Sequence, residues 1–364
     1  MERKVNIVST IGPSTDTKEM IEKLMDAGTR VFRQNFSHGA YEEKLDQMQI
    51  IREVAKAKGL EKEVKVLQDL QGPKIRLGDV KDDHKDVKTG QEIVLDYALR
   101  EEEHDGGDTI PVQYDIASKL HAGDIVFIWD GKVKATVVEV VSPTAVKIKI
   151  ENDGILKRRK GINMIGAKFN AEDIYPAKDH EDMKWGADKG YDWLAVSFTQ
   201  NAEDLVEARK LMKQYGYPET TQLVTKVETH EATKTDVILD AVVKEADVVM
   251  IARGDMGYEV GPEKVPLVQR KLIVACRKHG KESIVATQTV STMEHEPQPT
   301  RAEADNVFAS HILGADYVMT SEETAVGSWP VEATAMIRKV LDYAEDNSDV
   351  ISLEELARIT RYSA

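Results

Sequence analysis

The sequence has little of the chemistry that marks an extracellular or membrane protein. Among its 364 residues there is a single cysteine, Cys276, which excludes a disulfide within the chain and favours a reducing compartment. No apolar run approaches the roughly 20 residues of a membrane span. The first residues lead straight into a strand pattern without the apolar core of a signal peptide. We therefore predict a cytoplasmic protein.

Positive charge is also scarce. Lys and Arg number 49 against 64 Asp and Glu, which gives a net charge of -15 at pH 7. A surface of this sign repels nucleic acid and anionic lipid, so we expect neither nucleic acid nor a membrane as a partner. An anionic substrate would need a local cluster of cations.

Short apolar runs alternate with segments of helical period along most of the chain, which is the pattern of parallel βα units. The predicted strands are 5–10, 31–35, 64–70, 193–197, 222–226, 248–252, 283–287 and 317–320. The predicted helices are 15–27, 41–58, 181–189, 202–215, 233–244, 266–279, 301–313 and 330–343. Eight such units predict an α/β fold of the (β/α)8 TIM barrel type. An open doubly wound sheet is the alternative, but no Gly-x-Gly-x-x-Gly follows the first strand.

The parallel rhythm is interrupted between residues 77 and 163. Short alternating strands replace it, separated by turn signals such as the run at 104–108. We predict a small all-β lid domain at 77–163, inserted between two barrel parts at 1–76 and 164–346. The remaining residues, 347–364, would form a C-terminal tail with one short helix at 353–359.

Functional groups follow the predicted strands at the ends that a barrel brings to one mouth. Because side chains two apart on a strand point to the same side, Lys226 and Glu228 should lie together. Glu228 and Asp255 from adjacent strands, with an ammonium group between them, suit a divalent cation that itself holds an anion. The site would then handle a phosphoryl group or an enolate. The residues at these ends are Arg33, Asn35, Ser37, Asp69, Lys74, Arg76, Ser197, Lys226, Glu228, Gly254, Asp255, Thr287 and Gln288.

Most of these residues also have an ordinary structural interpretation. Arg33 could form an ion pair with a neighbouring helix, and the charges flanking the turn at 72–73 could be solvated surface groups. Glu228 and Asp255 could cap the helices that follow them. Lys226 is harder to explain in this way, because burial destabilises a charged lysine unless an anion lies nearby.

Six short blocks, in this order, resemble the pyruvate kinase family over nearly the whole chain. They are 9–13 (STIGP), 35–39 (NFSHG), 71–76 (QGPKIR), 252–257 (ARGDMG), 286–288 (ATQ) and 299–303 (PTRAE). The resemblance implies a barrel with a mobile β lid that closes over a nucleotide. It also implies transfer of a phosphoryl group from phosphoenolpyruvate to ADP.

The resemblance assigns roles to individual residues. Glu228 and Asp255 would bind Mg²⁺, or Mn²⁺ in its place. Lys226 and Arg33 would contact the phosphoryl group, and Thr287 would lie on the side from which the enolate receives a proton. The substrate-binding set implied is Arg33, Ser197, Lys226, Gly254, Asp255 and Thr287, and the nucleotide-binding set is Asn35, His38, Arg76 and Lys160.

The sequence departs from the family pattern around the monovalent cation. Many members hold K⁺ with the equivalents of Asn35, Ser37 and Asp69 and a following threonine, beside a glutamate. Here Leu70 replaces the threonine and Lys74 replaces the glutamate. A tethered ammonium group can supply the charge of the ion, so we predict activity without added K⁺.

A second departure concerns length. The α/β domain that usually follows the barrel in this family, and carries an effector site in many members, is not present after about residue 346. We therefore expect no control by sugar phosphates and a homo-oligomer, with a dimer favoured over a tetramer. The alternatives to a kinase are a Mg²⁺-dependent aldolase of pyruvate and a paralogue that binds phosphoenolpyruvate or nucleotide without turnover.

Overall fold

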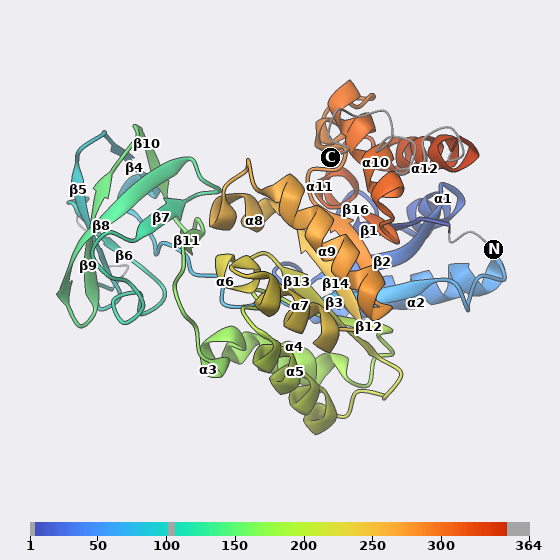
Figure 1. Cartoon of the computed structure of the whole chain (residues 1–364), viewed down its shortest axis with the longest axis horizontal. Helices are drawn as coiled ribbons and strands as arrows, with labels where there is room; N and C mark the ends of the chain where they lie inside the picture. The colour runs from blue at the N-terminus through green and yellow to red at the C-terminus, as the bar shows by residue number, and fades with distance from the viewer. Residues whose placement is uncertain (1–3, 101–105, 348–364) are drawn as a thin grey trace, which may run out of the picture.

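Eight parallel strands close into a barrel in the computed structural model, which describes residues 4–100 and 106–347 (Figure 1). Neighbouring strands follow one another along the chain, and the last pairs with the first. The predicted TIM barrel is therefore confirmed. The strands are β1 (Asn6–Ile11), β2 (Thr29–Asn35), β3 (Lys65–Asp69), β12 (Trp193–Val196), β13 (Gln222–Val227), β14 (Val248–Ala252), β15 (Glu282–Ala286) and β16 (Tyr317–Thr320).

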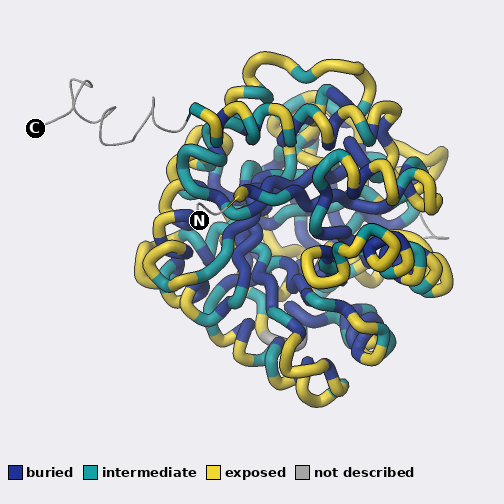
Figure 2. The backbone as a smooth tube through the Cα atoms, turned by 90° about the vertical axis from the view of Figure 1, so that its right-hand side faces the viewer, coloured by how far each residue is buried: buried dark blue, intermediate teal, exposed yellow. Residues whose placement is uncertain are grey.

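Helices surround the barrel because its strands are apolar on both faces and need cover outside as well as inside. The long helices are α1 (Lys18–Asp26), α2 (Tyr41–Ala57), α4 (Ala177–Gly186), α5 (Ala202–Tyr215), α7 (Asp236–Glu245), α9 (Val265–His279), α10 (Arg301–Leu313) and α12 (Pro330–Asp346). Shorter helices are α3 (Ala171–Ile174), α6 (His230–Thr233), α8 (Arg253–Val260) and α11 (Glu322–Ala325). In Figure 2 the buried backbone, in dark blue, lies toward the centre of the molecule, and exposed residues gather on the outer helices and loops.

Three details of the predicted helices are wrong. The helix predicted at 181–189 is α4, which begins earlier because Pro176 takes the N-cap position with extended backbone. The single helix predicted at 233–244 is split into α6 and α7, since the Thr235 hydroxyl caps a new helix by accepting from the amide of Ile238. Helix α8, directly after β14, was not predicted as a separate element. The helix predicted at 353–359 lies outside the described residues.

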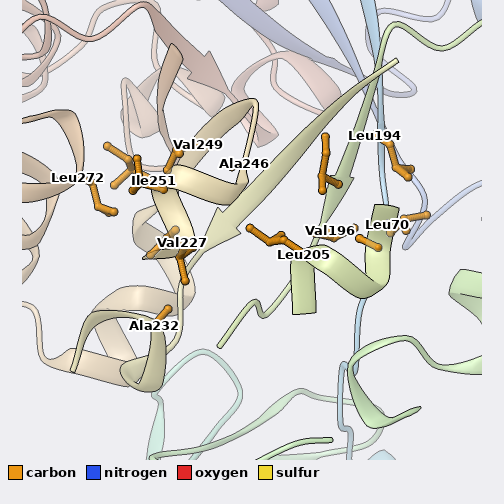
Figure 3. Packing of buried hydrophobic residues seen from close by; sticks show 14 of the residues in the cluster. Leu70, Leu194, Val196, Leu205, Val227, Ala232, Ala246, Val249, Ile251 and Leu272 are labelled. Atoms are coloured by element: carbon orange, nitrogen blue, oxygen red, sulfur yellow. The ribbon is translucent and has the colours of Figure 1, made fainter. Parts of the chain in front are cut away.

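The core has two layers that share the strands. Inside the barrel, Trp193 packs edge-on against Tyr317, with ring centroids 5.2 Å apart. Outside, side chains from β12, β13 and β14 pack against the helices, as Figure 3 shows for Val196, Val227 and Val249. With both faces buried, the strand ends are held rigidly enough to position polar side chains at the mouth.

The inserted β domain has its own sheets and its own core. A two-stranded sheet joins β4 (His84–Val87) to β10 (Gly154–Lys157). A six-stranded sheet contains β5 (Glu92–Asp96), β6 (Thr109–Pro111), β7 (Ile125–Ile128), β8 (Val133–Ser142), β9 (Ala145–Ile150) and β11 (Ile162–Met164). Its buried residues form a hydrophobic cluster of their own, which extends from Ile75 to Ala167. The domain bounds near residues 77 and 163 remain a prediction.

Helix α8 contacts the inserted β domain at the barrel mouth (Figure 1), and Asp173 of α3 makes a second contact through Tyr114 and Lys119. Tyr258 of α8 lies against Phe127 of β7, with ring centroids 6.1 Å apart. Gly131, whose φ is +74°, faces the same tyrosine, and a Cβ atom there would come within 2.4 Å of its ring. The two domains thus approach each other at the helix that carries Asp255.

Among the described residues, no helix combines the length and the apolar composition that would be needed to cross a lipid bilayer.

Candidate active site

A cavity of about 160 Å³ opens at the carboxyl end of the barrel. The strand ends bring most of the predicted site residues to its wall. These are Arg33, Asn35, Ser37, Lys74, Lys226, Glu228, Asp255 and Thr287. Asp69 and Ser197 are each 1% exposed and contact Lys226 from behind this wall. His38, Arg76 and Lys160 do not line the cavity.

Asp69 is the shared counter-ion of Arg33 and Lys226, two of the cations that line the cavity. The Nε of Arg33 donates to Asp69 Oδ2 at 2.6 Å, and the Nζ of Lys226 lies 3.5 Å from Oδ1. Arg33 also donates to the Thr10 hydroxyl at 3.0 Å. Arg33 is thus ion-paired, but with a strand residue at the mouth. Its predicted alternative, a pair with a neighbouring helix, is wrong.

Lys226 is held from three sides. Its Nζ donates to the Ser197 hydroxyl at 2.7 Å, and that hydroxyl donates to the Leu70 carbonyl at 2.7 Å. It also lies 3.7 Å from Glu228 Oε1, as expected for residues two apart on β13. Burial disfavours the charged amine, but the Asp69 and Glu228 carboxylates outweigh burial and raise the pKa of Lys226. The ammonium group is therefore charged and fixed in place.

The surroundings of Glu228 destabilise its ionised form. Burial, with the nearby charge of Asp255, raises its pKa to about 7 even though Lys226 acts in the opposite direction. Its Oε1 accepts from the amide of Phe198 at 2.8 Å. The helix-capping interpretation of Glu228 and Asp255 is wrong, because Thr229 caps α6 and no side chain caps α8.

Glu228 and Asp255 suit a hard divalent cation. Within the described part of the chain, no group of three or more His, Cys, Asp or Glu side chains could enclose a metal ion. Mg²⁺ is commonly held by one or two carboxylates and completes its coordination with water and substrate oxygens. A cation here would also relieve the repulsion that raises the pKa of Glu228. The residues present therefore fit Mg²⁺.

Thr287 directly follows β15 and lines the same cavity as the two carboxylates. Its backbone is left-handed, with φ +62°, and its hydroxyl donates to the Ala286 carbonyl at 2.7 Å. Gly254 leaves room beside it, since a Cβ atom there would lie 3.6 Å from the Thr287 hydroxyl. A β-branched residue in this conformation costs about 1–3 kcal/mol and persists only where its surroundings enforce it.

Two of the predicted nucleotide residues, Arg76 and Lys160, lie where the inserted β domain joins the barrel, whereas Asn35 lines the cavity itself. Arg76, half-buried, donates to the Lys74 carbonyl at 3.4 Å and pairs across a β-bridge with Gly161. The Nζ of Lys160 lies 5.3 Å from the centre of the Trp129 ring. Burial, followed by the charges of Lys74 and Arg76, lowers the pKa of His38. Lys74 and Arg76 therefore lie close enough to His38 for their charges to act on it.

Sequence reasoning missed three features of the site. It did not predict that Asp69 pairs with both cations. It also missed Asn163 of β11, whose side chain donates to Asp255 Oδ1 at 3.2 Å and links the inserted β domain to a predicted metal ligand. Arg253 lies in the block 252–257, but no role was predicted for it. Its position between a buried strand and a short helix was the feature that could have indicated one.

Comparisons with known proteins identify the family. Residues 2–334 match the sequence model of the pyruvate kinase barrel domain. The pyruvate kinase of Agrobacterium vitis is 39% identical over 350 residues, covering 94% of this chain and 68% of that protein. Pyruvate kinase 2 of Synechocystis sp. (strain ATCC 27184 / PCC 6803 / Kazusa) is 36% identical, covering 98% of this chain and 59% of that protein.

A solved structure has the same fold. The crystal structure of a pyruvate kinase from Cryptosporidium parvum aligns with a TM-score of 0.87 at 32% identity, covering 94% of this chain and 70% of that one. The pyruvate kinase of Staphylococcus aureus (strain MRSA252) is 36% identical, and the alignment covers 95% of this chain but 58% of that protein. Because the family model spans residues 2–334 and a pyruvate kinase covered over two thirds of its length is 39% identical, the chain belongs to the pyruvate kinase family.

Proposed function

We propose that this chain catalyses phosphoryl transfer from phosphoenolpyruvate to ADP. The observation that carries the proposal is the position of Lys226, a charged ammonium group held by Asp69, Glu228 and Ser197 at the wall of the mouth cavity. A buried ammonium group in this position can stabilise the negative charge of a phosphoryl group while it is transferred. Positioning and charge neutralisation supply most of the catalysis in phosphoryl transfer.

The reaction balances with the groups present. The bond between phosphorus and the enolate oxygen of phosphoenolpyruvate breaks, and a bond from phosphorus to a terminal ADP oxygen forms. Enolpyruvate then takes up one proton at its methylene carbon, giving pyruvate and ATP. Lys226 and Arg33 contact the migrating phosphoryl group, and Thr287 faces the carbon that is protonated.

Glu228 and Asp255 would hold Mg²⁺, or Mn²⁺ as a substitute, and the bound ion would supply positive charge to the anionic substrate. The amides at Gly254 and Asp255 face the substrate carboxylate from the first turn of α8. Ser197, whose hydroxyl already binds Lys226 and the Leu70 carbonyl, acts by orienting that lysine. Arg76 and Lys160, with Asn35 and His38, receive the nucleotide.

A coupled assay of pyruvate formation tests the proposal. The wild-type chain should form pyruvate from phosphoenolpyruvate, ADP and Mg²⁺, and Lys226→Met should lower kcat at least about 1000-fold. Lys65→Met is the matched control, since Lys65 lies over the Trp193 ring at the amino end of the strands. Absence of pyruvate with the wild-type chain, or equal loss in both variants, would contradict the proposal.

The same site supports activity without K⁺. Lys74 lines the cavity together with Asn35 and Ser37, and Leu70 is 1% exposed in the apolar cluster outside the barrel. An ammonium group beside this position can replace the charge of a monovalent cation. In buffer free of K⁺ and Na⁺, the wild-type chain should keep nearly full activity, whereas Lys74→Glu should become K⁺-dependent. Strong activation of the wild type by K⁺ would contradict this proposal.

We also propose a cytoplasmic homo-oligomer, with a dimer favoured. Two exposed apolar residues on α9, Leu267 and Val274, are 58% and 65% exposed and stand seven residues apart on one helix face. Light scattering should give twice the monomer mass, and Leu267→Glu should reduce it to that of a monomer. A wild-type monomer at micromolar concentration would contradict the dimer.

A further inference from the structure

Arg253, the first residue of α8, carries a buried charge that the proposed chemistry does not use. It is 8% exposed, and burial lowers its pKa to about 10. Within the described residues no carboxylate lies within ion-pair distance of it. A cation at the first position of a helix is also unfavourable for the helix dipole. Neither helix stability nor an ion pair therefore accounts for this arginine.

All five N–H groups of Arg253 are used, and every acceptor is neutral. Nε donates to the Ala286 carbonyl at 3.0 Å. Nη2 donates to the carbonyl of Thr287 and, at 3.2 Å, to that of Gln288. One side chain thus binds three consecutive carbonyls at the end of β15.

The remaining two N–H groups tie the guanidinium to neighbouring helices. Nη1 donates to Gln269 Oε1 on α9 at 3.3 Å and to Asn306 Oδ1 on α10 at 2.6 Å. Asn306 in turn donates its side-chain amide to the Gln288 carbonyl at 3.2 Å. The turn after β15 is therefore fixed to α8, α9 and α10 through one arginine.

This turn needs such a restraint because of its backbone. Thr287 and Gln288 both have positive φ, +62° and +50°, a conformation that is unfavourable for a β-branched residue. The Ala286 carbonyl accepts from both Arg253 and the Thr287 hydroxyl, so the guanidinium and that hydroxyl share one acceptor. The residue after Arg253, Gly254, lies beside the Thr287 side chain, and a Cβ atom added to it would be 3.6 Å from the Thr287 hydroxyl.

We propose that Arg253 is a positioning residue for the protonation step, holding the Thr287 hydroxyl in line with the enolate carbon. The proposal rests on the proposed function. It adds that different residues position the groups for phosphoryl transfer and for protonation. Lys226 and Arg33 serve phosphoryl transfer, while Arg253 acts through Thr287 on the proton. It also joins the helix bearing Asp255 to the Thr287 turn.

Arg253→Lys is the first test, because lysine keeps the charge but offers three N–H groups from one atom. We expect kcat to fall about 100-fold, since a displacement of about 1 Å at a reacting group has that effect. KM for phosphoenolpyruvate should change less than about threefold, because ground-state binding is retained. The solvent deuterium isotope effect on kcat should increase as protonation becomes rate-limiting.

Two further measurements separate positioning from a general structural role. Exchange of pyruvate methyl hydrogens with D2O, followed by NMR with enzyme, Mg²⁺ and ATP, should fall at least as much as kcat. Combining Arg253→Lys with Thr287→Val should cost little more than Thr287→Val alone, because both act on one group. The control is Arg338→Lys, a partly buried arginine that donates to the Val5 carbonyl at 2.7 Å at the other end of the barrel.

Amide hydrogen exchange of the segment 284–292 provides a readout that is independent of activity. Exchange should be faster in Arg253→Lys and unchanged in Arg338→Lys. If the wild type forms no pyruvate, the proposed function fails, while the exchange result still decides whether Arg253 holds the turn. The positioning proposal is overturned if the 284–292 amides exchange unchanged, if the isotope effect stays at the wild-type value, or if the double variant shows multiplied losses.

Discussion

The barrel mouth and the facing edge of the inserted β domain both carry cations, but they manage the charge differently. At the mouth, Arg33 and Lys226 are buried and share the Asp69 carboxylate. At the edge of the inserted β domain, Lys160 is half-buried and lies over the Trp129 ring, and no carboxylate of the described residues pairs with it. The cations at the mouth are thus held in place before substrate arrives, whereas Lys160 has only an aromatic contact.

The difference has a physical basis. Charges inside the barrel are poorly solvated, so each needs a partner within the protein in the free enzyme. Charges on the inserted β domain remain in contact with water and are stable without a partner. Changes at the mouth should therefore alter both catalysis and stability, and changes on the inserted β domain should alter binding alone.

Removing a metal ligand should produce the largest effect. Glu228→Gln keeps the shape of the side chain but removes one of two carboxylates, so kcat should fall about 1000-fold or more. The Mg²⁺ concentration for half-maximal activity should rise more than about tenfold, by analogy with losses at metal sites. Titration of activity with Mg²⁺ measures both, with Glu219→Gln, an exposed residue before β13, as the control. An unchanged Mg²⁺ requirement would remove Glu228 from the metal site.

Breaking the shared counter-ion should give the next largest effect. Asp69→Asn leaves Arg33 and Lys226 buried without their carboxylate, so the free energy of unfolding should fall by about 3 kcal/mol. The same change should lower kcat about 100-fold through displacement of Lys226. Denaturant unfolding and the coupled assay measure these quantities. If stability is lost without any change in kcat, Asp69 supports the fold but does not position the lysine.

A smaller effect is expected on the inserted β domain. Lys160→Met should raise KM for ADP about tenfold, a loss of about 1.4 kcal/mol of binding, with little change in stability. Lys157→Met is the matched control, because its amine lies 5.9 Å from the same Trp129 ring. Equal effects in the two variants would show a diffuse electrostatic contribution in place of a specific contact. A loss of stability in Lys160→Met would break the comparison between the two regions.

The last prediction concerns stability alone, at the turn that joins the barrel to the inserted β domain. Asp179 of α4 accepts from the amide of Gly72 in this turn, and burial, with the charge of Asp182, raises its pKa from 3.8 to about 7. Between these values the unfolded state binds fewer protons, so the free energy of unfolding should fall as the pH rises. The slope contributed by this group should reach at most about 1.4 kcal/mol per pH unit.

Asp179→Asn should remove this contribution, which unfolding curves between pH 4 and pH 7 would detect as a smaller loss of stability with rising pH. Asp46→Asn, at an exposed position of α2, is the control and should leave the slope unchanged. An identical slope in wild type and Asp179→Asn would mean that Asp179 is ionised throughout this range.

Much of the fold and part of the site could be predicted from local patterns. Apolar periodicity indicated the strands and most helices, and the side-chain period of two placed Lys226 and Glu228 together. The position of α8 was missed because a run of eight residues rich in glycine and charge has weak helical periodicity. The start of α4 was missed because a proline at the N-cap outweighed the periodic signal.

The sequence by itself determined the eight βα units, the inserted β domain and the set of groups at the strand ends, because these depend on patterns within a few residues. Only the tertiary structure decided which carboxylate or carbonyl group is the partner of each buried cation. Asp69 meets Arg33 from the adjacent strand and Lys226 from a strand far along the chain, and Arg253 meets the carbonyls after β15. Such partners are selected by barrel closure and by the cost of leaving a buried charge or N–H group unpaired, and no local pattern encodes either.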